Sequence, residues 1–135
     1  MKYEILEHKA DLKIKVKGLS KEELFLNALL GMEEGLGPET KETKEEIKRE
    51  IKIKSIDLSA LLVDFLNEAL YLIQVHKEIY NKIKFVKFSD KELEVELFGQ
   101  KVERFGEDIK AVTYHGLEVK QNKDGDWEAT ILFDI

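Results

Sequence analysis

Apolar and polar residues alternate along several segments of the chain, with the two-residue period of a β-strand that buries one face. The pattern is clearest in 12–18, where Leu12, Ile14 and Val16 alternate with lysines, and in 127–135, the last nine residues. Alternation of the same kind, or enrichment in β-branched and aromatic residues, predicts further strands at 3–7, 47–53, 79–88, 93–97 and 109–119.

Two other segments have the helical period of 3.6 residues. Ser20 begins a capping box, and the apolar positions after it predict a helix that ends near Gly35 or Gly37, before the only proline. Asp57 is a suitable N-cap for a second helix, which carries a wide apolar stripe as far as about His76. That second helix is therefore expected to lie in the core.

These elements predict an α+β fold in one domain, 1–135. The strands alternate as antiparallel sheets with one covered face do, so we expect a two-layer α/β sandwich. Its mostly antiparallel sheet would contain about six or seven strands, with both helices on one face. The polar segments 39–44 and 99–108 read as loops, and 122–126 reads as a hairpin turn because it contains Asp-Gly.

Composition narrows the class of protein. The chain has 135 residues, 43% hydrophobic, which is enough for a hydrophobic core. It contains no cysteine, which excludes disulfides, thiolate metal sites and cysteine nucleophiles. No long apolar run or signal peptide is evident, so we expect a cytoplasmic protein without a membrane partner. A net charge of −6 disfavours free nucleic acid as a direct ligand.

The candidate chemistry lies at two strand ends. Asp11 begins the first long strand and Asp134 closes the last, so antiparallel pairing would bring the two aspartates together on the face away from the core. Ile135 is in phase with the core residues of its strand, so we expect a buried side chain and a fixed α-carboxylate. Three such oxygens suit Ca²⁺, Mg²⁺ or Mn²⁺. The alternative is that both aspartates are ordinary solvated strand-end residues.

Other polar residues have similarly open interpretations. His8 either caps a loop or takes part in the metal site, and His115 is either a buried, hydrogen-bonded histidine or a contact to a nucleotide or the metal. Lys13, Lys15 and Lys17 form either a solvated strand face or a contact to a partner or RNA. No nucleophile elbow, phosphate loop or zinc motif is found, so we predict no catalytic residues.

Four stretches resemble the archease family. The sequence Glu-His-Lys-Ala-Asp at 7–11 is similar to that family's N-terminal motif Glu-His-Thr-Ala-Asp. Similar stretches follow in order at 57–72, at 109–117, and at Trp127 with 133–135, so the resemblance spans the chain. The run Ile-Lys-Ala-Val-Thr-Tyr-His within 109–117 is long and specific. At position 9 a lysine replaces the family's usual threonine, and with it a possible side-chain oxygen.

The resemblance implies a function that the residues alone do not indicate. Archeases are accessory proteins of the GTP-dependent RNA ligase that joins tRNA halves after intron removal. They promote guanylylation and multiple turnover of that ligase, and can broaden the nucleotides it accepts. The family's metal site, carried over by motif, falls on Asp11, Asp134 and Ile135; we expect Ca²⁺ there in a crystal, with Mg²⁺ or Mn²⁺ as alternatives.

The resemblance thus implies an activator that meets RNA only through the ligase. Family members have also been described as possible chaperones or modulators of RNA-modifying enzymes. Two rival functions remain: a metal-dependent phosphohydrolase that uses the same carboxylates, and a general chaperone that binds exposed apolar segments.

Overall fold

The computed structural model describes residues 2–8, 11–41 and 45–135, except for the side chains of Glu7 and His8. Lys9 lies outside the described residues. The elements in chain order are β1 (Tyr3–His8), β2 (Asp11–Gly18), α1 (Lys21–Leu36), β3 (Pro38–Thr40), β4 (Ile47–Lys54), α2 (Leu58–His76), β5 (Glu78–Phe88), β6 (Glu92–Phe105), β7 (Ala111–Thr113), β8 (Lys120–Gln121) and β9 (Trp127–Asp134).

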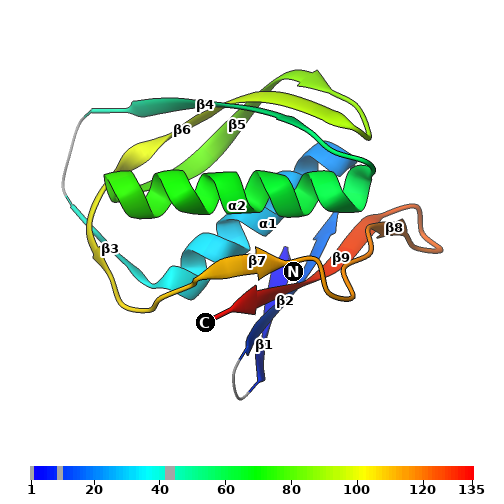
Figure 1. Ribbon diagram of the computed structural model, residues 1–135, viewed down its shortest axis with the longest axis horizontal. Coiled ribbons are helices and arrows are strands. Elements are labelled where there is room, and N and C mark those ends of the chain that lie inside the picture. The colour runs from blue at the N-terminus through cyan, green and yellow to red at the C-terminus, as the bar shows by residue number, and fades with distance from the viewer. Residues whose placement is uncertain (1, 9–10, 42–44) are drawn as a thin grey trace.

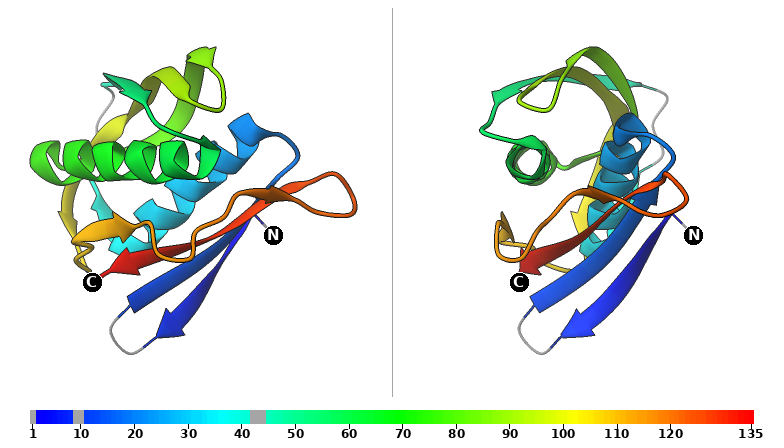
Figure 2. Two further views of the ribbon diagram at one scale, coloured as in Figure 1. Left: turned by 45° about the vertical axis from the view of Figure 1, so that its right-hand side comes forward. Right: turned by 90° about the vertical axis from the view of Figure 1, so that its right-hand side faces the viewer.

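The strands form two antiparallel sheets. The first sheet has the order β1-β2-β9-β7, with β8 also paired to β9. The second has the order β3-β6-β4, with β5 also paired to β6. Figure 1 and Figure 2 show the two helices lying between these sheets, and α1 and α2 each contact strands of both. The α+β class, the antiparallel pairing and the two helices are confirmed.

The division into two sheets was not foreseen. Alternation along a strand reveals its buried face, but it does not reveal which other strands share its sheet. Because both helices lie between two sheets, each must bury more than one narrow stripe. In α2 the buried residues cover a wide face: Leu61, Leu62, Val63, Phe65, Leu66, Ala69, Leu70 and Ile73.

The helix ends follow the predicted capping. The Ser20 hydroxyl accepts the backbone N–H of Glu23 at 3.1 Å, and the Asp57 carboxylate accepts that of Ala60 at 2.8 Å. Helix α1 ends at Leu36 and is capped by Gly37, whose positive φ of 57° is the left-handed conformation that glycine adopts without strain. These local signals therefore place both helices close to their predicted limits.

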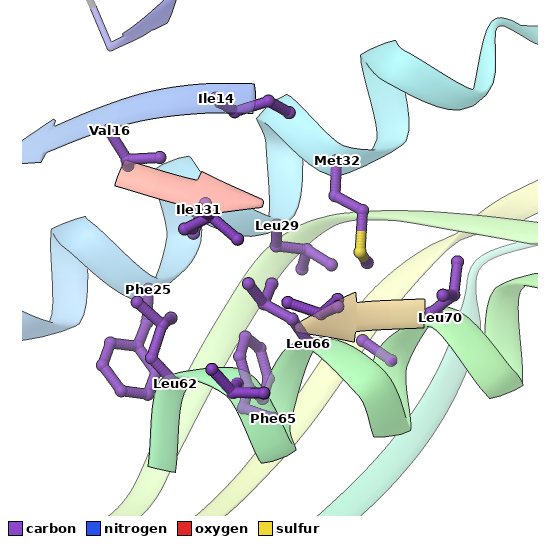
Figure 3. Packing of buried hydrophobic residues seen from close by; sticks show 14 of the residues in the cluster. Ile14, Val16, Phe25, Leu29, Met32, Leu62, Phe65, Leu66, Leu70 and Ile131 are labelled. Atoms are coloured by element: carbon purple, nitrogen blue, oxygen red, sulfur yellow. The ribbon is translucent and has the colours of Figure 1, made fainter. Parts of the chain in front are cut away.

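One hydrophobic core joins the two sheets and the helices. Figure 3 shows Ile14 and Ile131 of the first sheet packed near Leu29 and Met32 of α1 and Leu66 of α2. Each of these side chains is fully buried. At about 1.5–3 kcal/mol for a fully buried aliphatic side chain, this packing is the main stabilising contribution.

Helix α2 has the length and the apolar composition that a membrane-spanning helix requires; its mean hydropathy is 1.4. Half of that span is buried inside the protein, where it packs between the sheets. The helix therefore has the setting of a core helix.

Three predicted segments differ from the structure. The predicted loop 39–44 begins within β3, which ends at Thr40, and its residues 42–44 lie outside the described residues. The predicted loop 99–108 is largely the second half of β6, which continues to Phe105 and pairs with β3. The predicted strand 109–119 is a strand only at Ala111–Thr113. Side chains of α2 bind the backbone of this segment instead: Gln74 donates to the carbonyl oxygen of Ile109 at 2.8 Å, and Ser59 accepts the N–H of Val119 at 3.0 Å. A helix thus supplies partners that a neighbouring strand would otherwise supply.

Candidate metal rim at the chain terminus

Asp11 and Asp134 are direct partners in the β2–β9 register. Asp11 is the first residue of β2 and Asp134 the last of β9, as antiparallel pairing of the two strands predicted. Directly opposed residues project to the same face of a sheet, with their Cβ atoms about 4.5–5.5 Å apart. Asp11 is partly buried and Asp134 is exposed. We call Asp11, Asp134 and Ile135 the carboxylate rim.

The backbone of Asp134 is held on both sides. It pairs with Asp11 of β2 and with Ala111 of β7, and its carbonyl oxygen accepts the N–H of Lys110 at 2.7 Å. Figure 2 shows the C-terminus beside the start of β2 in both views. The residue that carries the terminal carboxylate therefore follows directly on a fixed peptide.

The expectation that the side chain of Ile135 is buried was wrong. Strand β9 ends at Asp134, and Ile135 is 45% exposed. Its phase follows that of Ala129, Ile131 and Phe133, which are buried. The alternation predicts the side to which a residue points, but not how far the covering helix extends along the strand.

Further carboxylates lie close to the rim. A pocket of about 350 Å³ is lined by Asp11 and Ile135 together with Glu34 from α1 and Glu107 and Asp108 from the segment before β7; apolar residues complete its wall. The Tyr3 hydroxyl donates to the Glu34 carboxylate. Sequence analysis missed these acids. The adjacent Glu107 and Asp108 were a visible signal, but their segment was assigned to a featureless loop.

The donor chemistry of the rim suits a hard divalent cation. Among the described residues, no three His, Asp or Glu side chains gather closely enough to hold a metal by themselves. A cation at the rim would therefore need the terminal carboxylate of Ile135 in addition to Asp11 and Asp134, with water completing its coordination.

The two candidate histidines have different outcomes. The backbone of His8 pairs with Asp11 at the end of the β1–β2 hairpin, but its side chain lies outside the described residues. His115 is exposed and follows β7 in a turn, where its N–H donates to the Thr113 hydroxyl at 3.0 Å. The buried interpretation of His115 was therefore wrong, because the predicted strand ends before it.

A partly buried ion pair lies in the second sheet, apart from the rim. Arg49, which interrupts the apolar phase of β4, binds Glu78 through two hydrogen bonds of 2.8 and 2.9 Å. The Tyr80 hydroxyl also donates to Glu78 at 2.8 Å. Burial alone would raise the pKa of Glu78, but the bonds from Arg49 and Tyr80 outweigh it and hold that pKa below its ordinary value.

A second buried carboxyl group lies on α1. Glu33 is 5% exposed and accepts the backbone N–H of Tyr80 at 2.5 Å. Burial raises the pKa of Glu33 to about 8, and the hydrogen bond from Tyr80 lowers it only in part. Glu33 is therefore protonated at neutral pH, whereas Glu78 is ionised.

Comparison with known proteins identifies the family. The Archease protein family (MTH1598/TM1083) matches residues 3–135. A protein archease of Methanosarcina barkeri is 37% identical over 141 residues, covering 98% of this chain and 95% of the relative. One of Pyrococcus abyssi is 30% identical over 142 residues and covers 99% of each chain. The chain belongs to the archease family.

Solved structures agree with the archease fold. The solution structure of Methanobacterium thermoautotrophicum protein 1598 has a TM-score of 0.74 at 28% identity, covering 99% of both chains. A crystal structure of an archease from Thermotoga maritima, described as a possible chaperone, has a TM-score of 0.62 at 28% identity and covers 96% of this chain and 94% of that one. The resemblance noted at 7–11 and along the chain is confirmed at the level of the family, and the metal role of the rim stays a prediction.

Proposed function

We propose that this archease is a cytoplasmic accessory protein, not itself an enzyme, that activates a GTP-dependent tRNA-splicing RNA ligase. It promotes guanylylation of the ligase and multiple turnover. The observation that carries this proposal is the direct pairing of Asp11 with Asp134, next to the last residue of the chain. The pairing supports a carboxylate rim at one exposed end of the first sheet, where a partner's active site can reach it.

Asp11, Asp134 and the carboxylate of Ile135 would hold a divalent cation. Ca²⁺, Mg²⁺ and Mn²⁺ all accept such oxygen ligands. When bound, the cation supplies positive charge that neutralises phosphate oxygens of the nucleotide in the ligase. The chain's own contribution is to fix two carboxylates on paired strands, so that little conformational entropy is lost when the ligand set assembles.

The charge of the protein fits an accessory role. A net charge of −6 repels free RNA, so the ligase is expected to provide the main binding surface for the RNA backbone. The rim then needs only to reach the nucleotide in the ligase; it does not need to bind the RNA substrate. This division of roles explains how an acidic protein takes part in RNA joining.

The test is multiple-turnover RNA ligation with Asp11→Asn and Asp134→Asn variants. Each keeps the size of the side chain and removes one charged ligand. We expect activation to fall by about tenfold or more, as is common when a group that supports a metal is removed. Asp124→Asn is the matched control, because Asp124 is an exposed aspartate in the β8–β9 turn. Full activation by both rim variants would refute the metal mechanism.

The two rival functions have separate readouts. A phosphohydrolase would release phosphate from GTP or cleave RNA without the ligase, in the presence of Mn²⁺ or Mg²⁺. A general chaperone would suppress aggregation of unrelated proteins and would need a large exposed apolar patch. The large exposed apolar side chains instead come from separate parts of the chain: Leu19 lies between β2 and α1, Tyr71 on α2 and Val86 on β5.

A further inference from the structure

The lysines on the outer faces of the two sheets differ in whether they form ion pairs with carboxylates. On the second sheet several lysines of β4 and β5 are paired across strands with glutamates of β6. Lys52 lies 3.5 Å from Glu94, Lys84 lies 3.6 Å from Glu96, and Lys87 lies 3.2 Å from Glu92. The positive charges of these paired lysines are therefore locally balanced.

On the first sheet three lysines lack such partners. Lys13, Lys15 and Lys17 alternate with buried residues along β2 and share its outer face. Within the described part of the chain, no carboxylate oxygen lies within 4.0 Å of any of their amino groups. Glu4 and Glu128 stand opposite Lys15 and Lys17 in the strand register, yet they form no ion pair with them. We call Lys13, Lys15 and Lys17 the lysine stripe.

The stripe is continuous with the carboxylate rim. Asp11 precedes it on the same strand and in the same phase. Alternate residues of a strand lie about 6.6–6.8 Å apart, so the stripe presents three cations at regular intervals that lead away from Asp11. A hollow of about 230 Å³ adjoins the stripe, and Lys15 and Lys120 line it together with Glu118 and Glu128, so its wall carries both signs of charge.

We propose that the lysine stripe binds consecutive phosphates of the RNA strand that the ligase holds. This inference rests on the proposed function, because it requires the carboxylate rim to face the nucleotide in the ligase. The RNA strand approaching that site would then run along β2. Phosphate contacts of this kind position a strand and carry no sequence information.

Composition favours RNA over an acidic protein surface as the occupant. Protein interfaces are enriched in aromatic residues, methionine and arginine at their centre and are depleted in lysine. The stripe consists of lysines, and the residues opposite Lys13 and Lys15 on β9 are Leu132 and Thr130. Regularly spaced ammonium groups match the repeating charge of a phosphate backbone. The negative net charge of the chain keeps its affinity for free RNA low, so the contact forms only in the ternary complex.

The test compares two triple variants of the full chain in RNA ligation. The variant K13Q/K15Q/K17Q removes the stripe, and K52Q/K84Q/K87Q removes three paired lysines from the second sheet. Both change the net charge by −3, so a general charge effect would appear in both. A third variant, K13R/K15R/K17R, keeps the cations. Thermal unfolding of each variant shows that all four proteins remain folded.

Two readouts separate this inference from the proposed function. In ligation at several salt concentrations, loss of three phosphate contacts should reduce the log–log salt slope by about 2, from roughly 0.7 per contact. In guanylylation of the ligase without RNA, the stripe variant should match the wild type. The arginine variant and the second-sheet control should match the wild type in both assays.

Each remaining outcome overturns the inference. An unchanged salt slope in the stripe variant would show that the stripe does not contact RNA. Loss of guanylylation without RNA would assign the stripe to an acidic surface of the ligase. If the wild type itself fails to activate the ligase, the proposed function fails, and the inference fails with it.

Discussion

Asn67 binds both backbone polar groups of Val112. Its side-chain NH₂ donates to the carbonyl oxygen at 3.0 Å, and its side-chain oxygen accepts the N–H at 2.8 Å. Helix α2 thereby takes the place of a neighbouring strand along the outer edge of β7. On its other edge β7 pairs with β9, where Ala111 stands opposite Asp134. A core helix therefore fixes the strand that holds the end of the chain.

Replacing Asn67 with alanine should loosen β7 from α2. The substitution leaves the buried N–H and carbonyl of Val112 without these partners, and we expect a loss of about 2 kcal/mol in the free energy of unfolding. Urea denaturation measures this loss. Asn81→Ala is the control, because Asn81 is exposed on β5 and should cost less than about 0.5 kcal/mol. Equal losses in the two variants would contradict this role of Asn67.

The protonated Glu33 predicts a stability that depends on pH. The unfolded chain ionises this group near its ordinary pKa of 4.5, whereas the folded protein keeps it protonated up to about pH 8. The contribution of Glu33 to the free energy of unfolding is therefore fully present below pH 4.5. It is lost progressively as pH rises towards about 8. The slope is up to about 1.4 kcal/mol per pH unit.

The variant Glu33→Gln should remove that slope. Glutamine keeps an acceptor for the Tyr80 N–H and has no charge to lose. We expect the variant to gain stability over the wild type between pH 4.5 and 8, as measured by thermal unfolding across that range. Glu22→Gln on the exposed side of α1 is the control and should follow the wild type. Parallel curves for all three proteins would show that Glu33 is ionised in the fold.

The Arg49–Glu78 pair predicts strong coupling. The side chain of Glu78 is fully buried while that of Arg49 is 31% exposed, so Arg49→Met leaves a buried carboxylate with fewer partners. We expect a loss of about 2–3 kcal/mol, below the full range for a buried pair because Arg49 reaches solvent. The double variant Arg49→Met/Glu78→Gln should recover part of that loss. Additive losses in a double-mutant cycle would show that the pair is not coupled.

How much the sequence revealed depends on whether the signal was local. Ser20, Asp57 and Gly37 fixed the helix limits through contacts only a few residues away, so the sequence could predict them. The β2–β9 pairing was also predictable, because each strand had a clear phase, and an aspartate begins β2 and another ends β9. The short β7 was not, since its backbone partners come from α2, about 45 positions earlier.

The interrupted phase at Arg49 shows the same limit. A charged residue on the apolar face of β4 was visible in the sequence, but its partner Glu78 lies on a strand reached only after α2. The exposure of Ile135 likewise depends on how far the covering helix extends along β9. Contacts between residues far apart in the sequence do not change the hydrophobic period of either segment, so the period could not predict them.

Extending the chain tests the terminal carboxylate of the rim. Two glycines added after Ile135 would move that carboxylate away from Asp11 and Asp134 while leaving β9 intact. We expect activation of the ligase to fall by about tenfold or more, as for the aspartate variants. Ile135→Val is the control, because it keeps the carboxylate and trims a side chain that is already 45% exposed. Full activity of the extended chain would remove Ile135 from the site.

The most direct measurement is anomalous diffraction from crystals of the wild-type protein soaked in Mn²⁺. The account predicts a single strong anomalous peak in contact with Asp11, Asp134 and the carboxylate of Ile135, and its loss in crystals of Asp11→Asn. Crystals that show no peak at the rim under saturating Mn²⁺, or a peak that persists unchanged in Asp11→Asn, would contradict it.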